Sequence, residues 1–488
     1  MKRPVWISTL MLSGLMAVVV SVGTVSARPA AKPSAVVQLE FPMPLVAPHE
    51  RVEVGYDART IPAATGFLFV RNNLQHGFTR VPLRWRKALQ QQVPSDRLRL
   101  LRGVVPVQIV RGHRLFYYGV VHDPKSGRSV RIPAGSVESA WVLTGARIVS
   151  LGTHRFGHLR SPEAVVARAG PKAVAFENPT EGARYGPWSF TVARDRSVWL
   201  LDELNKRLLV WAPGEPNARP RPVPLGSFSP VDFALGPAGS FYVTGCPLGG
   251  SKPFVQHLCR LRATGRVLWT STLATDIFNT QLRLGPDGTL YWTGPGPSSP
   301  RTEREGTTSV WMPAVTRGGK PLSPAQQRRR SLGGYQPLPG GLRLLSAITR
   351  FEKDWAYGRA PHEERFALLD PTRGRLVRSW RVTSRTVIWP HPEATPGLVG
   401  HDLVVVLKVS TSSVPTKTEY VVLRLAATGS GTRARFSLPS SSWLNTGGRS
   451  AWGDVITDLR IGPGSRLYQL GSSPTTGVKI YRYSLAPA

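Results

Sequence analysis

The chain has 488 residues, of which 41% are hydrophobic, so it is long enough for two to three domains with a sizeable core. Its 48 glycines and 44 prolines indicate many turns, and no convincing amphipathic stretch exceeds about ten residues, which argues against a mainly helical protein. The formal net charge of +34 makes attraction to polyanions the first functional expectation.

The first 27 residues are expected to be an export signal. Lys2 and Arg3 form a basic start, no charge follows until Arg28, and residues 25–27 (Val-Ser-Ala) offer the small side chains that signal peptidase requires. Cleavage there removes two bases and no acid, so the charge falls from +34 to +32. An uncleaved anchor is the alternative, because the uncharged run 4–27 approaches the roughly 20 residues that span a bilayer. Either outcome places the rest of the chain outside the cytoplasm.

A β-sandwich-like module is predicted at residues 36–159, after a Pro/Ala-rich linker at 28–35. Its clearest element is a hairpin formed by 115–121 and 129–133, joined by an Asp-Pro-Lys-Ser-Gly turn in which Pro presets the backbone and Gly supplies a positive φ. The run 147–151 is predicted to be a further strand of this module. Several short antiparallel strands over roughly 120 residues suit an immunoglobulin-like or fibronectin-like sandwich.

His154 and His158 stand at the junction between this module and the rest of the chain. Two histidines four residues apart would share one face of a helix and could bind a metal ion. Gly157 and Pro162 argue against a helix here, and no carboxylate motif stands near. We therefore expect two solvent-facing imidazoles in a loop.

A β-propeller is predicted at residues 171–488. Residues 186–211 contain three short strand patterns, at 188–193, 198–201 and 207–211, and weaker copies of this unit follow. Each copy has an apolar strand, a turn containing Gly and Pro, and an aromatic strand. Periods of about 40–50 residues with four strands each are typical of propeller blades. Three copies begin at Leu235, Leu284 and Ile461.

Counting these units predicts six blades, with five or seven as alternatives because the fourth and fifth are weakly marked. The ring would close if residues 172–176 paired into the last blade as an extra strand, which would remove the open sheet edges of a linear stack. The predicted fold class is therefore all-β: an N-terminal β-sandwich-like domain followed by a six-bladed β-propeller.

The loop between the second and third strands of 186–211 contains Asp202, Asn205 and Arg207, followed by Leu208. This Asp-x-x-Asn-x-Arg pattern resembles an NHL repeat, and the resemblance implies a propeller blade. The corresponding loops of later blades lack these residues, so the resemblance covers one blade. NHL proteins include protein- and RNA-binding platforms and a few enzymes, so the resemblance implies no single function.

Within this tight loop, Asp202 and Asn205 can accept backbone N–H groups, and Arg207 can bridge to a carboxylate or to the next blade. We therefore expect these three residues to be structural. Ligand contact is the alternative, because loops on this face of a propeller often bind ligands. Glu203 has no evident role in the turn, which makes its free carboxylate a candidate for binding.

Long loops in the second and third blades, 244–256 and 293–308, are the predicted binding rim. A mobile insertion without a specific role is the alternative. With Glu203, the candidate binding residues are Trp292, Arg301, Glu303, Arg304 and Trp311.

Cys246 and Cys259 are the two cysteines of the chain, and both lie in the proposed second blade. An exported chain enters an oxidising compartment, and no neighbouring His or Cys completes a metal site, so a disulfide is expected. It would close a long loop and stabilise the fold by roughly 2–4 kcal/mol.

The sequence contains no Gly-x-Ser-x-Gly elbow, no His-Glu-x-x-His and no phosphate-binding loop, so no enzyme class is indicated. A metal-dependent lactonase or lyase stays an alternative, with a calcium-type ion in the propeller channel, because single carboxylates and amides from different blades could converge there. The groups that could do so are Glu177, Asp202, Asp232, Asn279 and Asp454; the clearest histidine cluster in the propeller combines His391 and His401 with Glu393 and Asp402.

The charge favours non-catalytic binding at the cell envelope. Expected partners are anionic cell-wall polymers, lipid head groups, acidic polysaccharide or extracellular nucleic acid, or else a protein partner. Most bases are spread evenly and only residues 328–330 form a run, so a compositional bias is the alternative. No nucleic-acid-reading motif is visible, so specific recognition of nucleic acid is not expected.

Overall fold

The computed structural model describes residues 38–40, 44–58, 60–61, 63–87, 99–157, 159, 161–177, 186–187, 189–226, 230–245, 256–274, 281–294, 310–349, 362–389, 397–411, 417–428, 431–439 and 458–486. They belong to one compact unit, Val37–Ala488. Within these ranges the chain is nearly all β, and its helices are limited to α2 (Pro324–Arg329) and three short 3-10 turns. None of the described helices is long and apolar enough to cross a membrane. The all-β prediction is confirmed.

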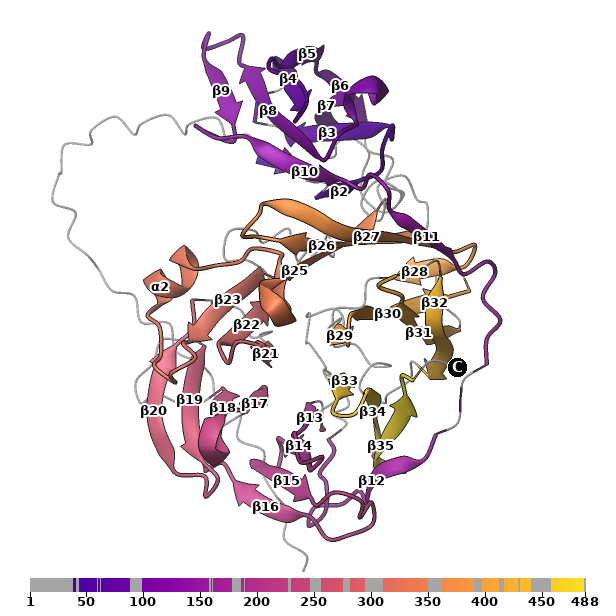
Figure 1. Cartoon of the computed structure of the whole chain (residues 1–488). Helices are drawn as coiled ribbons and strands as arrows, with labels where there is room; N and C mark the ends of the chain where they lie inside the picture. Colours follow the sequence, from indigo (N-terminus) through magenta and orange to yellow (C-terminus); the bar gives the residue numbers. More distant parts are fainter. Residues whose placement is uncertain are drawn as a thin grey trace, which may run out of the picture. The chain divides into compact units, whose positions relative to one another are not determined.

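The N-terminal module consists of two sheets (Figure 1). The first contains, in spatial order, β1 (Gln38–Glu40), β3 (Val52–Asp57), β7 (Arg99–Val105) and β6 (Arg84–Lys87). The second contains β2 (Leu45–Val46), β10 (Glu138–Val142), β8 (Arg114–His122), β4 (Thr65–Asn72) and β5 (Thr79–Pro82), with β9 (Ser129–Ile132) also paired to β8.

These two sheets pack face to face as a sandwich. Tyr56 of β3 lies against Gly119 of β8, where any Cβ would collide with the tyrosine ring. The hairpin predicted from the sequence is confirmed as β8 and β9, which pair antiparallel. Gly127 closes its turn at φ 67°, in the left-handed region that glycine adopts without strain.

Six further sheets follow in the described chain and form the propeller (Figure 1). The first is β13 (Phe190–Val192), β14 (Val198–Asp202), β15 (Arg207–Trp211) and β16 (Arg221–Pro224); the second is β17 (Phe233–Leu235), β18 (Ser240–Thr244), β19 (His257–Arg262) and β20 (Val267–Thr272); the third is β21 (Gln281–Leu284), β22 (Leu290–Gly294) and β23 (Val310–Val315).

The remaining three sheets each recruit a short or distant strand. The fourth is β24 (Gln336–Pro337), β25 (Arg343–Thr349), β26 (Glu363–Asp370), β27 (Arg375–Thr383) and β11 (Arg147–Ser150); the fifth is β28 (Val387–Trp389), β30 (Asp402–Ser410), β31 (Thr418–Leu425) and β32 (Thr432–Pro439), with β29 (Gly397–Val399) on β30; the sixth is β33 (Leu459–Gly462), β34 (Arg466–Ser473), β35 (Gly477–Ser484) and β12 (Glu163–Ala167).

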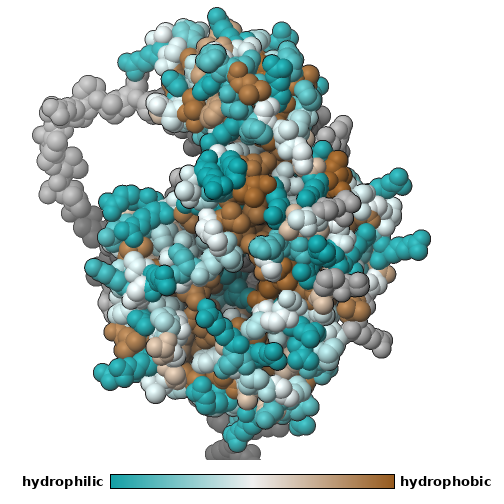
Figure 2. Space-filling model, viewed as in Figure 1, coloured by the Kyte–Doolittle hydropathy of each residue, from teal (hydrophilic) through white to brown (hydrophobic). Residues whose placement is uncertain are grey.

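Apolar side chains are buried between successive sheets of the propeller. Between the first and second sheets, Leu201 and Leu208 pack with Phe233 and Phe241. Similar clusters join the second sheet to the third, the fourth to the fifth, the fifth to the sixth and the sixth back to the first. In order, these clusters run from the fourth sheet through the fifth, sixth, first and second sheets to the third, and successive sheets packed face to face in this way are typical of propeller blades. Figure 2 shows a recess where the sheets converge.

Closure of the ring differs from the prediction. The strand that pairs into the last sheet is β12, which runs antiparallel to β35, and residues 172–176 do not take this place. Val174 forms an isolated bridge with Ala169. The N–H of Ala175 donates to Asp202 at 3.2 Å, so this segment is held against the first blade. The predicted closing segment was therefore wrong, because its backbone groups are bonded elsewhere.

The strand predicted at 147–151 also belongs elsewhere. Its residues form β11, which pairs parallel with β27 of the fourth propeller sheet and not with the sandwich. The period-two pattern of the strand is the same for either sheet, so the sequence did not reveal its partner. The outer edge of β27 was available, and β11 covers it.

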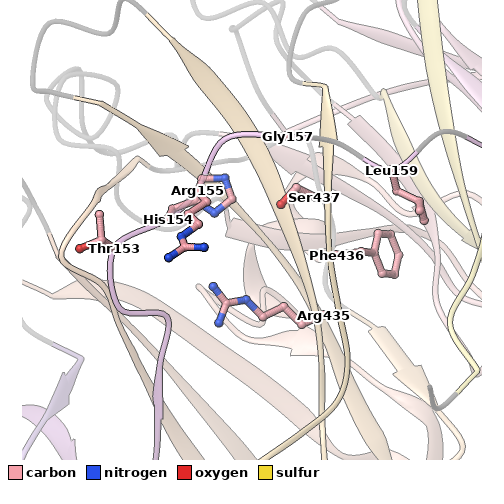
Figure 3. A pocket seen from close by; sticks show the side chains of 8 residues that line it. All are labelled: Thr153, His154, Arg155, Gly157, Leu159, Arg435, Phe436 and Ser437. Carbon is pink, nitrogen blue, oxygen red and sulfur yellow. The ribbon is translucent and has the colours of Figure 1, made fainter.

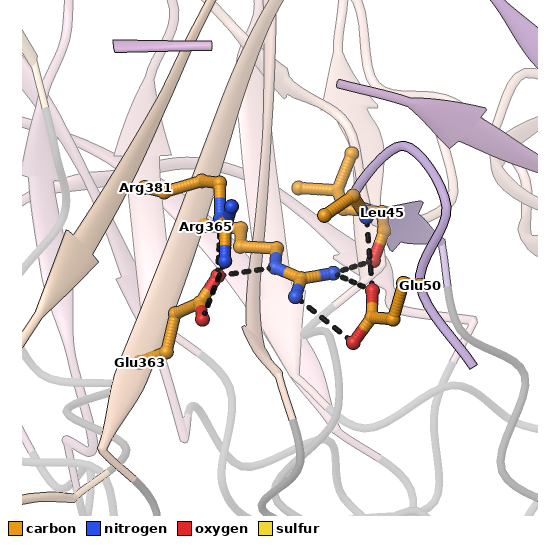
Figure 4. A network of polar contacts seen from close by, with 6 residues as sticks. Leu45, Glu50, Glu363, Arg365 and Arg381 are labelled. Carbon is orange, nitrogen blue, oxygen red and sulfur yellow. Dashed lines mark hydrogen bonds and ion pairs between the residues drawn. The ribbon is translucent and has the colours of Figure 1, made fainter. Parts of the chain in front are cut away.

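A buried ion-pair network joins the N-terminal module to the fourth sheet (Figure 4). Arg365 of β26 donates from Nη1 and Nη2 to the two carboxylate oxygens of Glu50, at 2.7 and 3.1 Å. Its Nε donates to Glu363 at 2.7 Å, and Arg381 donates to both oxygens of Glu363 at 2.7 and 3.1 Å. Burial alone would raise the pKa of Glu363, but the hydrogen bonds and charges of Arg381 and Arg365 outweigh it and lower the pKa.

Apolar packing surrounds this network. Leu45, Trp141 and Leu143 of the module form one cluster with Leu345 and Leu369 of the fourth sheet. The carbonyl of Leu45 also accepts from Arg365 Nη1 at 3.1 Å. The arginine therefore has its charge matched by two carboxylates in a site from which water is excluded.

We predict that Glu50→Gln lowers the free energy of unfolding by about 3 kcal/mol, because it removes one carboxylate from a buried arginine. Denaturant unfolding followed by tryptophan fluorescence measures the change. Glu215→Gln is the matched control, because Glu215 is an exposed acid in the turn after β15. Equal unfolding midpoints for the two variants would contradict the role given to Glu50.

Candidate functional site

The Asp-x-x-Asn-x-Arg loop anchors the chain segment that precedes the first blade. Asp202 is fully buried, and its Oδ2 accepts from Asn205 Nδ2 and from Arg207 Nε, both at 2.8 Å. Asn205 Nδ2 and Arg207 Nη2 also donate to the carbonyl of Ala173. Asp202 also accepts from the N–H of Ala175, as expected for a carboxylate in this loop. Asn205 was expected to accept a backbone N–H group as well, but its side chain donates instead. The three side chains tie residues 173–175 to the blade.

The predicted binding residues that the structure describes, Glu203, Trp292 and Trp311, are buried. Glu203 is 9% exposed and does not present the free carboxylate that the sequence suggested. Trp292 is fully buried, and its Nε1 donates to Gln327 Oε1 at 2.9 Å. Trp311 is also buried and lies edge-on to Tyr291. Both indoles pack the third sheet and offer no surface to a ligand.

Three other predicted rim residues, Arg301, Glu303 and Arg304, lie outside the described residues, so the rim at 293–308 stays a prediction. Cys246 also lies outside them. Cys259 is buried in β19, with its Sγ 3.4 Å from Thr270 Oγ1. The disulfide likewise stays a prediction.

Two of the carboxylates considered for a metal site, Asp232 and Asp402, are engaged in hydrogen bonds with other protein groups. Asp232 Oδ2 accepts from the N–H of Leu282 at 2.7 Å and lies 3.5 Å from Arg283 Nη1. Asp402 accepts from Arg424 Nε and from the N–H of Ala427, both at 2.8 Å. The described residues contain no group of three or more His, Cys, Asp or Glu side chains that could hold a metal ion. Glu177 and His401 are exposed, and Asn279, Asp454, His391 and Glu393 lie outside the described residues.

Asp232 instead links the inner strands of several blades. Ser189, next to β13, donates to its Oδ1, while Arg283 of β21 bonds its Oδ2. Arg460 of β33 donates to the carbonyl of Phe190 at 3.1 Å. Burial lowers the pKa of Arg283, with a contribution from the like charge of Arg460. This network consists of side chains from neighbouring blades that are far apart in the sequence, so sequence spacing did not reveal it.

An open cleft of about 550 Å³ lies between residues 153–159 and β32 (Figure 3). His154 forms its inner wall and is buried, with Nε2 2.8 Å from Glu419 Oε2. The N–H of Gly157 donates to the same oxygen at 3.1 Å. The expectation of a solvent-facing imidazole was therefore wrong for His154, because the buried carboxylate needs donors; His158 lies outside the described residues.

Two exposed arginines face this cleft from opposite walls. Figure 3 shows the guanidinium groups of Arg155 and Arg435 directed toward the same space. Arg435 Nη2 donates to the carbonyl of Leu151 at 3.0 Å, and neither arginine is in an ion pair within the part of the chain that the structure describes. Phe436 adds an apolar side to the cleft. The cleft suits an anion, because the carboxylate behind its wall, Glu419, is already hydrogen-bonded to His154 and Gly157.

Comparison with known proteins identifies no family. No family model and no curated protein matches the chain. Among solved structures, it is similar to a PQQ-bound aldose sugar dehydrogenase from Streptomyces coelicolor (12% identity, 67% of this chain and 96% of that chain, TM-score 0.33). It is also similar to virginiamycin B lyase from Staphylococcus aureus (12% identity, 75% and 91%, TM-score 0.29). Similarities this weak indicate no activity for this chain. The fold is established by its own sheet topology.

We predict that Cys246 and Cys259 form a disulfide, as the oxidising compartment and the even cysteine count indicate. Mass spectrometry of the unreduced protein should then find one cross-linked peptide pair, and a thiol reagent should label the unfolded chain only after reduction. The double substitution Cys246→Ser/Cys259→Ala should lower the free energy of unfolding by about 2–4 kcal/mol. Labelling of both thiols without reduction would disprove the bond.

Proposed function

We propose that this protein is an exported, non-catalytic β-propeller protein that binds an anionic polymer at the cell envelope, with an NHL-like repeat as its first blade. The observation that carries the proposal is the cleft of Figure 3, in which Arg155 and Arg435 face one space without an acidic partner among the described residues. Two guanidinium groups that converge on one space can bridge the oxygens of a carboxylate, sulfate or phosphate group.

The distribution of charge supports this function. The chain has 63 lysines and arginines but 29 aspartates and glutamates. Several of the acids are used inside the fold: Asp202, Glu363 and Asp402 each bond to arginines. Each such pair removes one base together with one acid, so the excess of 34 bases over acids (63 − 29) remains and produces a positive field that attracts polyanions.

The sequence features at the N-terminus support export to the cell envelope. A basic start, an uncharged stretch and a Val-Ser-Ala site before Arg28 form an export signal, which lies outside the described residues. The even number of cysteines also suits an oxidising compartment. Anionic polymers are abundant at cell surfaces, so the location and the charge point to one class of partner.

We predict that the purified protein is retained on immobilised anionic polymer at about 0.15 M salt, where attraction from charge alone is largely screened. The panel consists of polygalacturonate, inorganic polyphosphate and a single-stranded oligonucleotide, each beside a neutral polysaccharide. Arg155→Gln/Arg435→Gln should weaken retention on the bound polymer by at least about tenfold, because even one charge-assisted hydrogen bond contributes about 1.5–3 kcal/mol.

The matched control is Arg262→Gln/Arg266→Gln, which removes the same charge from the exposed β19–β20 hairpin. Melting temperatures of all variants separate lost binding from lost folding, since Arg435 also bonds the carbonyl of Leu151. Wild-type protein that fails to bind every polymer of the panel would refute the proposed function. Equal binding by the cleft variant and the control variant would show that the cleft is not the binding site.

A further inference from the structure

The outward face of the second sheet of the sandwich carries a layer of aromatic rings. Residues on β4 and β8 alternate between buried positions that face the first sheet and half-buried positions that face outward. Phe69 of β4 lies opposite Tyr118 of β8 in the ladder, and their rings stack with centroids 4.8 Å apart. Phe78 meets the ring of Tyr118 edge-on at 5.1 Å.

Arginines cover these rings. Arg80 Cζ lies 3.3 Å from the centroid of Phe67, and Arg131 Cζ lies 4.0 Å from that of Tyr118. The ring of Phe116 has two such neighbours, since Arg71 and Arg114 lie 4.9 and 5.6 Å from its centroid. We name this surface of β4, β5, β8 and β9, with its four arginines, the Arg–aromatic face.

No acid neutralises these four charges within the described chain. The outward positions of the four strands contain no Asp or Glu, and none of the four arginines is in an ion pair there. Their hydrogen bonds go to neutral oxygens: the carbonyls of Gln75 and Ser136, at 2.9 and 3.0 Å, and Ser139 Oγ, at 3.2 Å. Asp123, in the β8–β9 turn, bonds to Ser126 and to the N–H of Lys125 instead.

This arrangement differs from that of the interior arginines. Arg365, Arg207 and Arg424 each hold a carboxylate at 2.7 or 2.8 Å. On the Arg–aromatic face, the rings restrict the motion of the guanidinium groups. The N–H donors at the edges of these groups have no acid to bind. Like charges on adjacent strands repel one another, so a polyanion laid across the sheet would relieve the repulsion as it binds.

We propose that the Arg–aromatic face is a second binding surface, which holds the carboxylates of an acidic polysaccharide. This inference rests on the proposed function and adds both a site and a ligand class. The planar fork of a guanidinium group matches a carboxylate with two parallel hydrogen bonds. Same-face residues lie roughly 6.7 Å apart along a strand and about 4.8 Å apart between strands, so the face offers an array that suits a repeating anion.

The coverage of the rings decides between polymer classes. Proteins that hold single-stranded nucleic acid stack its bases on open aromatic rings. Here Phe67, Phe116 and Tyr118 are covered by arginines, and Tyr118 also by Phe69, so a base would have to displace them. The face instead offers guanidinium edges beside the hydroxyls of Ser129 and Ser139, which match the carboxylates and hydroxyls of an acidic sugar chain.

The test measures binding of the purified full chain to polygalacturonate at about 0.15 M salt by isothermal titration. Arg80→Gln/Arg131→Gln removes two exposed guanidinium groups and should raise Kd about tenfold or more. Arg262→Gln/Arg266→Gln is the control for charge and should leave Kd within about twofold. Phe67→Leu keeps the net charge but removes the ring under Arg80, and should raise Kd about threefold by loosening the guanidinium group.

The outcomes separate this proposal from the proposed function. Loss of polygalacturonate binding in the Arg80/Arg131 variant, with the control unchanged and both melting temperatures like wild type, supports the Arg–aromatic face. Equal affinity of the face and control variants overturns the face but leaves the cleft as the binding site. Binding to polyphosphate or to an oligonucleotide without binding to polygalacturonate overturns the ligand class. Absence of binding to every polymer overturns both proposals.

Discussion

Buried carboxylates held by arginine are the interaction on which the rest of the structure depends. A carboxylate removed from water destabilises a fold unless charge-assisted hydrogen bonds replace its hydration. In this chain such pairs lie where separate parts of the fold meet. Glu50 and Glu363 hold Arg365 between the sandwich and the fourth sheet, and Asp202 with Arg207 fixes the segment before the first blade.

The same pairs influence the surface. Each internal pair uses one acid and one arginine, so the excess of 34 bases (63 − 29) is left to the rest of the chain. Two settings of arginine in the described chain contrast with each other. Interior ones such as Arg424 hold a carboxylate, whereas exposed ones such as Arg80 and Arg131 lie on aromatic rings. The second setting leaves positive charge ordered and available on the Arg–aromatic face.

Local patterns predicted the parts of the fold that depend on neighbouring residues. The hairpin of β8 and β9 and the first three strands of the propeller occur where turn chemistry and alternation placed them. Pairing between distant strands was not predictable in this way. β11 and β12 have ordinary strand patterns, and the open edges of β27 and β35 decided where they pair. His154 was expected in solvent, but Glu419 is 265 residues away in the sequence and draws it into the interior.

By itself, the sequence determined the all-β class, the succession of blade-like units and the strong positive charge, because composition, turn residues and strand periodicity act over short stretches of chain. Only the tertiary structure decided which acids are used internally and which arginines remain on the surface. The physical reason is that a charge is neutralised by whichever partner folding brings within hydrogen-bond distance. The partners of Arg365 and Arg80 come from separate strands and loops, and no spacing along the chain records them.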